Sequence, residues 1–174
     1  MKVLAKLVES YSKVMGIFFK GIRATLAVAL VIMVVVTSME VVRRYLFGLS
    51  FVWAEELVKF LLVAVTFLGG AAAYRAGGMA YLDLITSRFS VKKQRNISII
   101  NNVVVIVTCL YLSLQGFTYA FSPMVAKMNS IGLKLNMTVV YITIPIGFVL
   151  ITVFALEQIL KAIVEIQEEK KGAQ

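Results

Sequence analysis

The chain has 174 residues with a net charge of +9, and 60% of its residues are hydrophobic. This apolar share exceeds the value of about 45–50% typical of soluble domains, and its long apolar blocks predict one all-α integral membrane domain. The bases lie between these blocks, where they direct membrane topology, so the charge does not indicate nucleic-acid binding. With no histidine and one cysteine, the sequence predicts no metal site and no cofactor, and it contains no catalytic motif.

Residues 2–20 are predicted to form an amphipathic helix that lies in the membrane interface. Apolar side chains recur there at helical spacing from Val3 to Phe19, and most of the lysines fall between them. This pattern is typical of helices that bury one face among lipid headgroups. Packing of the same apolar face on a partner protein is the alternative interpretation.

Four blocks without charged residues follow the amphipathic segment, at 24–39, 60–74, 96–126 and 135–156. A helix needs about 20 residues to cross the hydrocarbon core of a bilayer. The first two blocks are shorter than that, so their helices must extend into charged sequence. We therefore predict four transmembrane helices, at approximately 22–44, 52–75, 96–121 and 136–160.

The distribution of bases predicts that both termini lie in the cytoplasm. The N-terminal segment and the link 75–95 contain five bases each, and the C-terminal tail contains three. The link 127–134 contains two bases, and the three bases of the link 40–59 are offset by three acids. Because lysine and arginine are enriched in cytoplasmic loops, we expect these two links on the external side.

Charges gather at both helix ends that the first external link joins. Glu40 lies three and four residues before the two arginines, and Glu55 lies four residues before Lys59, spacings at which side chains are neighbours on a helix. The cluster is either an interfacial charge set anchored by the tryptophan or a docking site that faces protein. For Glu40 the neighbouring arginines favour pairing over transport. The cluster comprises Glu40, Arg43, Arg44, Trp53, Glu55, Glu56 and Lys59.

Small residues mark one face of the second predicted helix. Gly69, Ala73 and Gly77 recur every four residues, next to Gly70. Small side chains at this spacing allow another helix to approach closely. We assign these residues, with Arg75 at the helix end, to helix packing, either within the chain or on a partner.

Polar residues form a seam along the third predicted helix. Asn101, Thr108 and Gln115 are spaced by seven residues, beside a parallel row of Asn102, Cys109 and Gly116. Polar side chains in lipid seek partners on neighbouring helices, and no charge joins the seam, so helix packing is favoured over a pore lining.

In the fourth helix, Pro145 and Gly147 predict a kink, because proline removes a hydrogen bond to the carbonyl four residues earlier.

The stretch RRYLFGLSFVWAEELVKFLLVAVTFLGGAAAYRAGGMAYLDLI resembles the signature region of the small, Q-type (DctQ-like) membrane subunit of tripartite ATP-independent periplasmic (TRAP) transporters. The PIGF motif of the fourth helix is also similar to that family, and the resemblance covers about residues 20–160. The family often has a histidine after the glycines, where this chain has Met79. The matching residues are Arg44, Tyr45, Trp53, Glu55, Glu56, Gly69, Arg75, Gly77, Pro145 and Gly147.

The resemblance implies a non-enzymatic scaffold subunit in the bacterial inner membrane. It implies a large M-type subunit that carries substrate and sodium, and a periplasmic substrate-binding protein that delivers an organic acid of the C4-dicarboxylate or sialic acid type. Membrane lipids are further expected partners. Two other functions stay open: a self-sufficient four-helix exporter of the multidrug type that uses Glu40, and an assembly or lipid-organising protein, which the amphipathic N terminus would suit.

Overall fold

The computed structural model of the chain describes residues 2–77 and 91–172, and these residues contain helices and no β-strand. Four of the helices are long and apolar enough to cross a membrane. The predicted all-α membrane fold with four spans is therefore confirmed. The helices are α1 (Lys2–Phe47), α2 (Val52–Arg75), α4 (Val91–Ala120), α5 (Pro123–Ala126), α6 (Met137–Tyr141) and α7 (Thr143–Gly172).

Helix α1 unites the predicted amphipathic segment and the first predicted span in one helix of 46 residues. No proline lies between the two segments, and Gly21 costs only about 1 kcal/mol in a helix interior. At about 1.5 Å per residue, α1 is about 69 Å long, more than twice the roughly 30 Å of the hydrocarbon core. Helix α1 must therefore tilt strongly or continue beyond that core.

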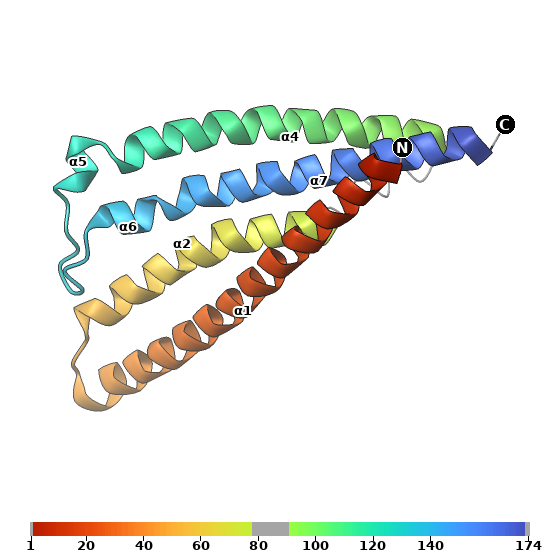
Figure 1. Cartoon of the computed structure of the whole chain (residues 1–174). Coiled ribbons are helices and arrows are strands. Elements are labelled where there is room, and N and C mark those ends of the chain that lie inside the picture. Colours follow the sequence, from red (N-terminus) through yellow and green to blue (C-terminus); the bar gives the residue numbers. More distant parts are fainter. Residues whose placement is uncertain (1, 78–90, 173–174) are drawn as a thin grey trace.

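The long helices are arranged as a fan. In Figure 1 they lie side by side in the order α4, α7, α2 and α1, close together near the two termini and spread apart at the opposite end. The main packing pairs are α4 with α7, α7 with α2 and α2 with α1, and α1 also contacts α7. We call the end that holds the termini the terminal end, and the end that holds residues 48–51 and 121–136 the loop end.

The hydrophobic core is small and consists of residues from α2 and α7. It comprises Ala71, Tyr74, Phe154 and Ala155, with partly buried side chains of α1 and α4 packed against it. In the most apolar stretch of each span, only 11% to 33% of residues are buried within the chain. Each helix therefore presents a broad apolar face to its surroundings.

Two glycines bring α7 close to its neighbours. A Cβ added at Gly147 would lie 2.7 Å from Cβ of Phe67 in α2, and one added at Gly116 of α4 would lie 3.1 Å from Cβ of Pro145. Helix α6 ends at Tyr141, whose carbonyl is the one that Pro145 leaves without a helical donor. The interruption between α6 and α7 thus lies where proline disturbs the helix, next to both close contacts.

Candidate functional site

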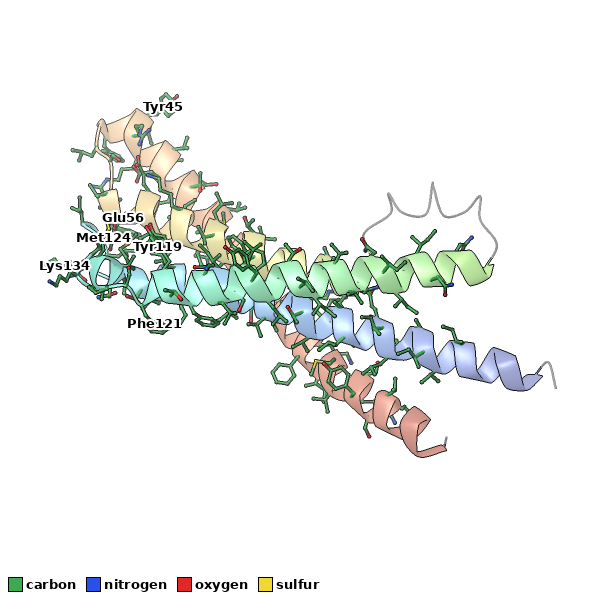
Figure 2. All side chains as sticks on the ribbon, turned by 90° about the horizontal axis from the view of Figure 1, so that it is seen from above. Tyr45, Glu56, Tyr119, Phe121, Met124 and Lys134 are labelled. Atoms are coloured by element: carbon green, nitrogen blue, oxygen red, sulfur yellow. The ribbon has the colours of Figure 1, made fainter. Side chains whose placement is uncertain are left out.

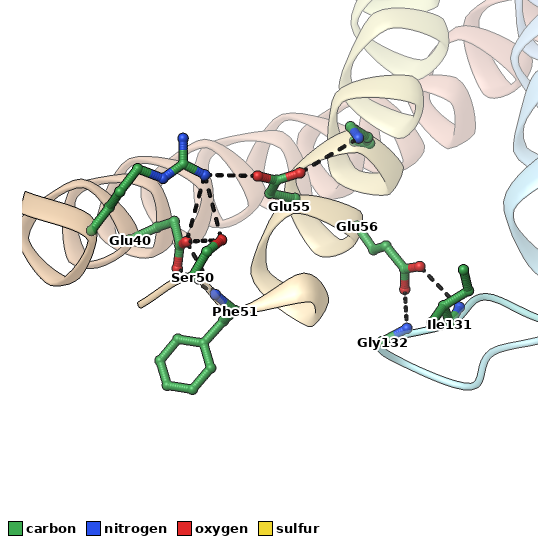
Figure 3. Close-up of polar contacts among 9 residues, drawn as sticks. Glu40, Ser50, Phe51, Glu55, Glu56, Ile131 and Gly132 are labelled. Carbon is green, nitrogen blue, oxygen red and sulfur yellow. Dashed lines mark hydrogen bonds and ion pairs between the residues drawn. The ribbon is translucent and has the colours of Figure 1, made fainter. Parts of the chain in front are cut away.

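The carboxylate of Glu40 caps the beginning of α2. Glu40 is 7% exposed, and its Oε1 accepts hydrogen bonds from the Ser50 hydroxyl at 2.6 Å and from the Phe51 backbone N–H at 3.1 Å (Figure 3). Phe51 directly precedes α2, and its own side chain makes no capping bond. Donors at a helix start lack intrahelical acceptors and attract negative charge. Glu40 therefore ties the end of α1 to the start of α2.

The other charges of the first external link surround this cap. Arg44 Nη2 lies 2.9 Å from Glu55 Oε1, and Lys59 Nζ lies 3.9 Å from Glu55 Oε2. The guanidinium carbon of Arg43 lies 3.3 Å from the centroid of the Phe51 ring, a cation–π contact. Arg44 thus forms an ion pair, whereas Arg43 makes an aromatic contact. We refer to Glu40, Arg43, Arg44, Ser50, Phe51, Glu55 and Lys59 as the cap cluster.

Glu56 holds the second external link, through contacts that we call the loop-end clasp. Its carboxylate oxygens accept the backbone N–H groups of Ile131 and Gly132, each at 2.9 Å (Figure 3), and that of Leu133 at 3.0 Å. Consecutive backbone N–H groups of this kind form an anion-binding concavity. A Cβ added at Gly132 would lie 2.6 Å from the backbone nitrogen of Trp53, so only glycine fits between the link and α2.

The link that Glu56 holds has a fixed shape of its own. The Ser130 N–H donates to the Leu135 carbonyl at 2.9 Å, and the Met137 N–H donates to the Met128 carbonyl at 2.9 Å. Ser122 caps the short helix α5 by accepting the N–H of Val125. These bonds present exposed side chains at the loop end, among them Phe121, Met124 and Lys134 in Figure 2.

At the terminal end, Glu157 of α7 collects donors from three helices. Its carboxylate oxygens lie 2.8 and 3.0 Å from Nε and Nη2 of Arg75 in α2, and 2.7 Å from Nζ of Lys161 in α7. The hydroxyl of Ser12 in α1 donates to the same carboxylate at 2.8 Å. Only 2% of the Glu157 side chain and 15% of the Arg75 side chain are exposed. We call Ser12, Arg75, Glu157 and Lys161 the terminal ion cluster.

Further contacts extend the terminal ion cluster to α4. The Arg75 guanidinium carbon lies 5.1 Å from the ring centroid of Phe19 and 5.5 Å from that of Phe154. The neighbouring Tyr74 donates its hydroxyl hydrogen to Oδ1 of Asn102 in α4 at 2.5 Å. All four long helices therefore meet around the pair Arg75–Glu157 and the adjoining Tyr74.

The sequence interpretation missed Glu157 and assigned Arg75 only to helix packing. A signal was present, because Arg75 directly follows the uncharged block 60–74 and Glu157 directly follows the block 135–156. The expected topology places both ends on the same side of the membrane. Two opposite charges that face the membrane at the same level are candidates for a pair.

The small-residue face of α2 points away from the other helices of the chain. A Cβ added at Gly69 or Gly70 would meet nothing within 4 Å, and Ala73 is exposed. Gly77 does not continue this row as predicted, because α2 ends at Arg75 and Gly77 has a positive φ of 74°. The buried small residues of α2 are instead Ala71 and Ala72. Packing of the exposed row on a partner stays a prediction, and Met79 lies outside the described residues.

The two polar rows of α4 also differ in exposure, one facing outward and one packing within the chain. Thr108 and Gln115 are exposed and Asn101 is partly buried, whereas the parallel row packs within the chain. Within the described part of the chain, no hydrogen bond is made by the Gln115 amide. The outward residues are therefore available to a partner, while the packed row consists of Asn102, Cys109 and Gly116.

The acids at the ends of the spans serve to hold helices and links in place. Glu40, Glu55, Glu56 and Glu157 each have a partner within the chain. Among the described residues, no group of three or more histidine, cysteine, aspartate or glutamate side chains could hold a metal ion. What these acids do chemically is join helix ends through hydrogen bonds and ion pairs.

A comparison with protein families matches residues 8–165 to the model of the DctQ component of tripartite ATP-independent periplasmic transporters. The match includes the cap cluster, the loop-end clasp and the terminal ion cluster. A search of curated proteins finds no match to the chain.

Proposed function

Because this chain belongs to the DctQ family of tripartite ATP-independent periplasmic transporter components, we propose that it is a scaffold for the large M-type membrane subunit. The chain is the small subunit of such a transporter and a multi-pass protein of the inner membrane. The family is a transporter component and not an enzyme family. In these systems the small subunit works with an M subunit and a periplasmic binding protein.

The observation that carries the scaffold proposal is the internal use of the acids at the span ends. A carboxylate that transports an ion must exchange its ligands during each cycle, whereas these acids fix one arrangement of the helices. Glu40 illustrates the difference, because it caps α2 through Ser50 and Phe51. This geometry disfavours the alternative of an exporter that uses Glu40 as its carrier.

The scaffold surface, in this proposal, is the pair of outward rows on α2 and α4. Gly69 and Ala73 allow a partner helix to approach α2 closely. The amide of Gln115 offers hydrogen bonds from α4, and polar side chains in a span are satisfied across helix interfaces. The limited burial within the chain leaves both rows accessible.

We further propose a sodium-coupled importer of an organic acid, of the C4-dicarboxylate or sialic acid type. In this proposal the large subunit carries substrate and sodium, the binding protein delivers the acid, and the small subunit widens the fixed part of the membrane assembly. The resemblance of the signature residues to the Q-type subunit supports this scheme. The excess of bases near the termini supports a cytoplasmic location for both of them.

The proposal is tested by co-expression of the chain with its large subunit. We expect one complex that survives mild detergent, and loss of organic-acid uptake when the chain is deleted. Ala73→Trp should lower the yield of the complex, because a bulky side chain would obstruct the outward row of α2. Val31→Trp is the matched control, since Val31 is 63% exposed on α1. Separate purification of the two proteins, with uptake unaffected by deletion, would refute the scaffold role.

Orientation is tested separately with single cysteines in a Cys109→Ala background. Lys13→Cys places a thiol on the exposed surface of α1, and Lys127→Cys places one in the second external link. A membrane-impermeant maleimide applied to spheroplasts should label only the thiol at position 127. Labelling of position 13 alone would invert the proposed topology.

A further inference from the structure

A groove of about 380 Å³ opens between α1 and α2 at the loop end. Its walls combine charged residues of the cap cluster with small apolar side chains, among them Val36 and Val58. Val36 lies about one helical turn from Glu40, on the side of the bilayer centre. On the α1 side the groove therefore changes from charged to apolar as it enters the membrane, whereas on the α2 side Lys59 lies about one turn deeper than Glu55.

The charged side chains that line the groove retain free hydrogen-bonding capacity. Arg44 uses only Nη2 in its contacts with described residues, although a guanidinium carries five N–H donors. Lys59 lies 3.9 Å from Glu55, beyond hydrogen-bond distance, so its three donors are also available. Oε2 of Glu55, which Figure 3 draws with its dashed line to this lysine, has no closer contact among the described residues.

These free groups are complementary to one kind of molecule. Several donors on Arg44 and Lys59 suit a phosphate group, which accepts charge-assisted hydrogen bonds. The free carboxylate oxygen of Glu55 suits a primary ammonium group, which donates them. The four charged residues that line the groove, Glu40, Arg44, Glu55 and Lys59, sum to zero charge, as a zwitterionic ligand requires.

We propose that this groove binds one phospholipid with a phosphoethanolamine headgroup. The phosphate accepts hydrogen bonds from the free donors of Arg44 and Lys59, the ammonium group contacts Oε2 of Glu55, and one acyl chain follows the valine-lined wall toward the bilayer centre. The order of the α1 wall, from Arg44 and Glu40 to Val36, corresponds to the order of a lipid from headgroup to chain. The proposal goes beyond the scaffold function and does not depend on it.

The test is native mass spectrometry of the chain in complex with its large subunit. The complex is exposed in micelles to dioleoylphosphatidylethanolamine, to the corresponding phosphatidylcholine or to phosphatidylglycerol. We expect one retained phosphatidylethanolamine on the small subunit, with occupancy lower by about tenfold in Lys59→Gln, the effect of losing one charge-assisted hydrogen bond. Lys134→Gln is the control, because Lys134 lies at the loop end but does not line the groove.

Two further variants separate the headgroup from the acyl chain. Glu55→Gln should remove the preference for phosphatidylethanolamine over phosphatidylcholine, because a choline headgroup has no N–H donor. Val58→Trp should fill the apolar part and abolish retention of every lipid while leaving all four charges in place. Equal lipid retention by wild type and Val58→Trp would overturn the proposal. Photocrosslinks from position 41, which lines the groove, to the large subunit instead of lipid would overturn it as well.

Discussion

The two ends of the fan use acidic side chains in opposite ways. At the terminal end, one buried carboxylate, that of Glu157, joins α1, α2 and α7. At the loop end, three separate carboxylates each hold one helix end or link, those of Glu40, Glu55 and Glu56. The side chain of Glu55 is 48% exposed, whereas that of Glu157 is 2% exposed.

This difference determines how each end responds to disturbance. Removal of one partner from a buried ion pair costs about 3–5 kcal/mol, because the remaining charge stays buried without compensation. Exposed pairs contribute about 0–1 kcal/mol. The terminal end therefore holds the fold together, whereas the exposed pair Arg44–Glu55 at the loop end can rearrange when a ligand or partner binds, while buried Glu40 keeps α1 joined to α2.

The largest effect is expected from Glu157→Ala, which leaves the guanidinium of Arg75 buried without its carboxylate. We expect a loss of about 3–5 kcal/mol in the free energy of unfolding, measured by SDS titration in mixed micelles. Glu9→Ala is the matched control, because Glu9 forms an exposed pair with Lys13 in α1. Similar stability of both variants would mean that the terminal ion cluster does not hold the helices together.

A double variant sharpens the same point. Arg75→Met combined with Glu157→Met removes both charges and retains apolar volume. Such a replacement of a buried pair is often neutral or stabilising, so the double variant should be more stable than Glu157→Ala. A double variant less stable than the single one would contradict this explanation.

A smaller effect is expected midway between the ends, from Gly147→Ala. The added Cβ would lie 2.7 Å from Cβ of Phe67, so α7 must move away from α2 at a cost of about 1–3 kcal/mol. Gly69→Ala is the control, because its Cβ meets nothing within 4 Å and alanine is the better helix former. Thermal melts in detergent should show a lower melting temperature for the first variant only.

At the loop end, Glu56→Gln should act locally. The variant removes the charge that the N–H groups of Ile131, Gly132 and Leu133 surround. We expect hydrogen exchange of these amides to increase by about tenfold, with the exchange of α7 unchanged. Lys127→Gln, on the same link, serves as the control. An increase throughout α7 would show that the two ends are not independent.

The smallest effect is expected from Glu55→Gln, which removes the partner of Arg44 at an exposed site. Stability should change by less than about 1 kcal/mol.

We also predict that Glu56→Ala reduces the yield of the complex with the large subunit more than Lys127→Ala does, because Glu56 orders the second external link. The yields after affinity purification measure this, and equal yields would refute it.

The fold class could be predicted because it depends on local properties of the sequence. Block lengths and charged block ends indicated four spans, and the shortness of the block 60–74 indicated that the second helix includes Glu55 and Glu56. The spacing of Glu55 and Lys59 along one helix also predicted that they are neighbours, and the structure places Oε2 of Glu55 3.9 Å from Nζ of Lys59. Such pairs need no knowledge of how helices are arranged.

Contacts between distant segments could not be predicted in this way. The bonds of Glu56 to residues 131–133 depend on the shape of a link 75 or more residues away. The close contact between helices at a glycine could not be predicted either. Spacing in the sequence indicated Gly69 as a packing residue, whereas α2 and α7 approach each other closely at Gly147 of α7. Periodicity identifies a face of a helix but not the helix that packs on it.

The terminal ion cluster has a consequence for the biosynthesis of the chain. Ser12 and Glu157 are 145 residues apart, and at about 5–20 residues per second the ribosome needs roughly 7–30 s to cover that distance. The contact of Glu40 with Phe51 spans only 11 residues and can form early. Newly inserted α1 and α2 would thus first be joined at the loop end. Arg75 would stay without the carboxylate of Glu157 until α7 has been inserted. In a chain whose synthesis stops before α7, this arginine would remain unpaired with Glu157.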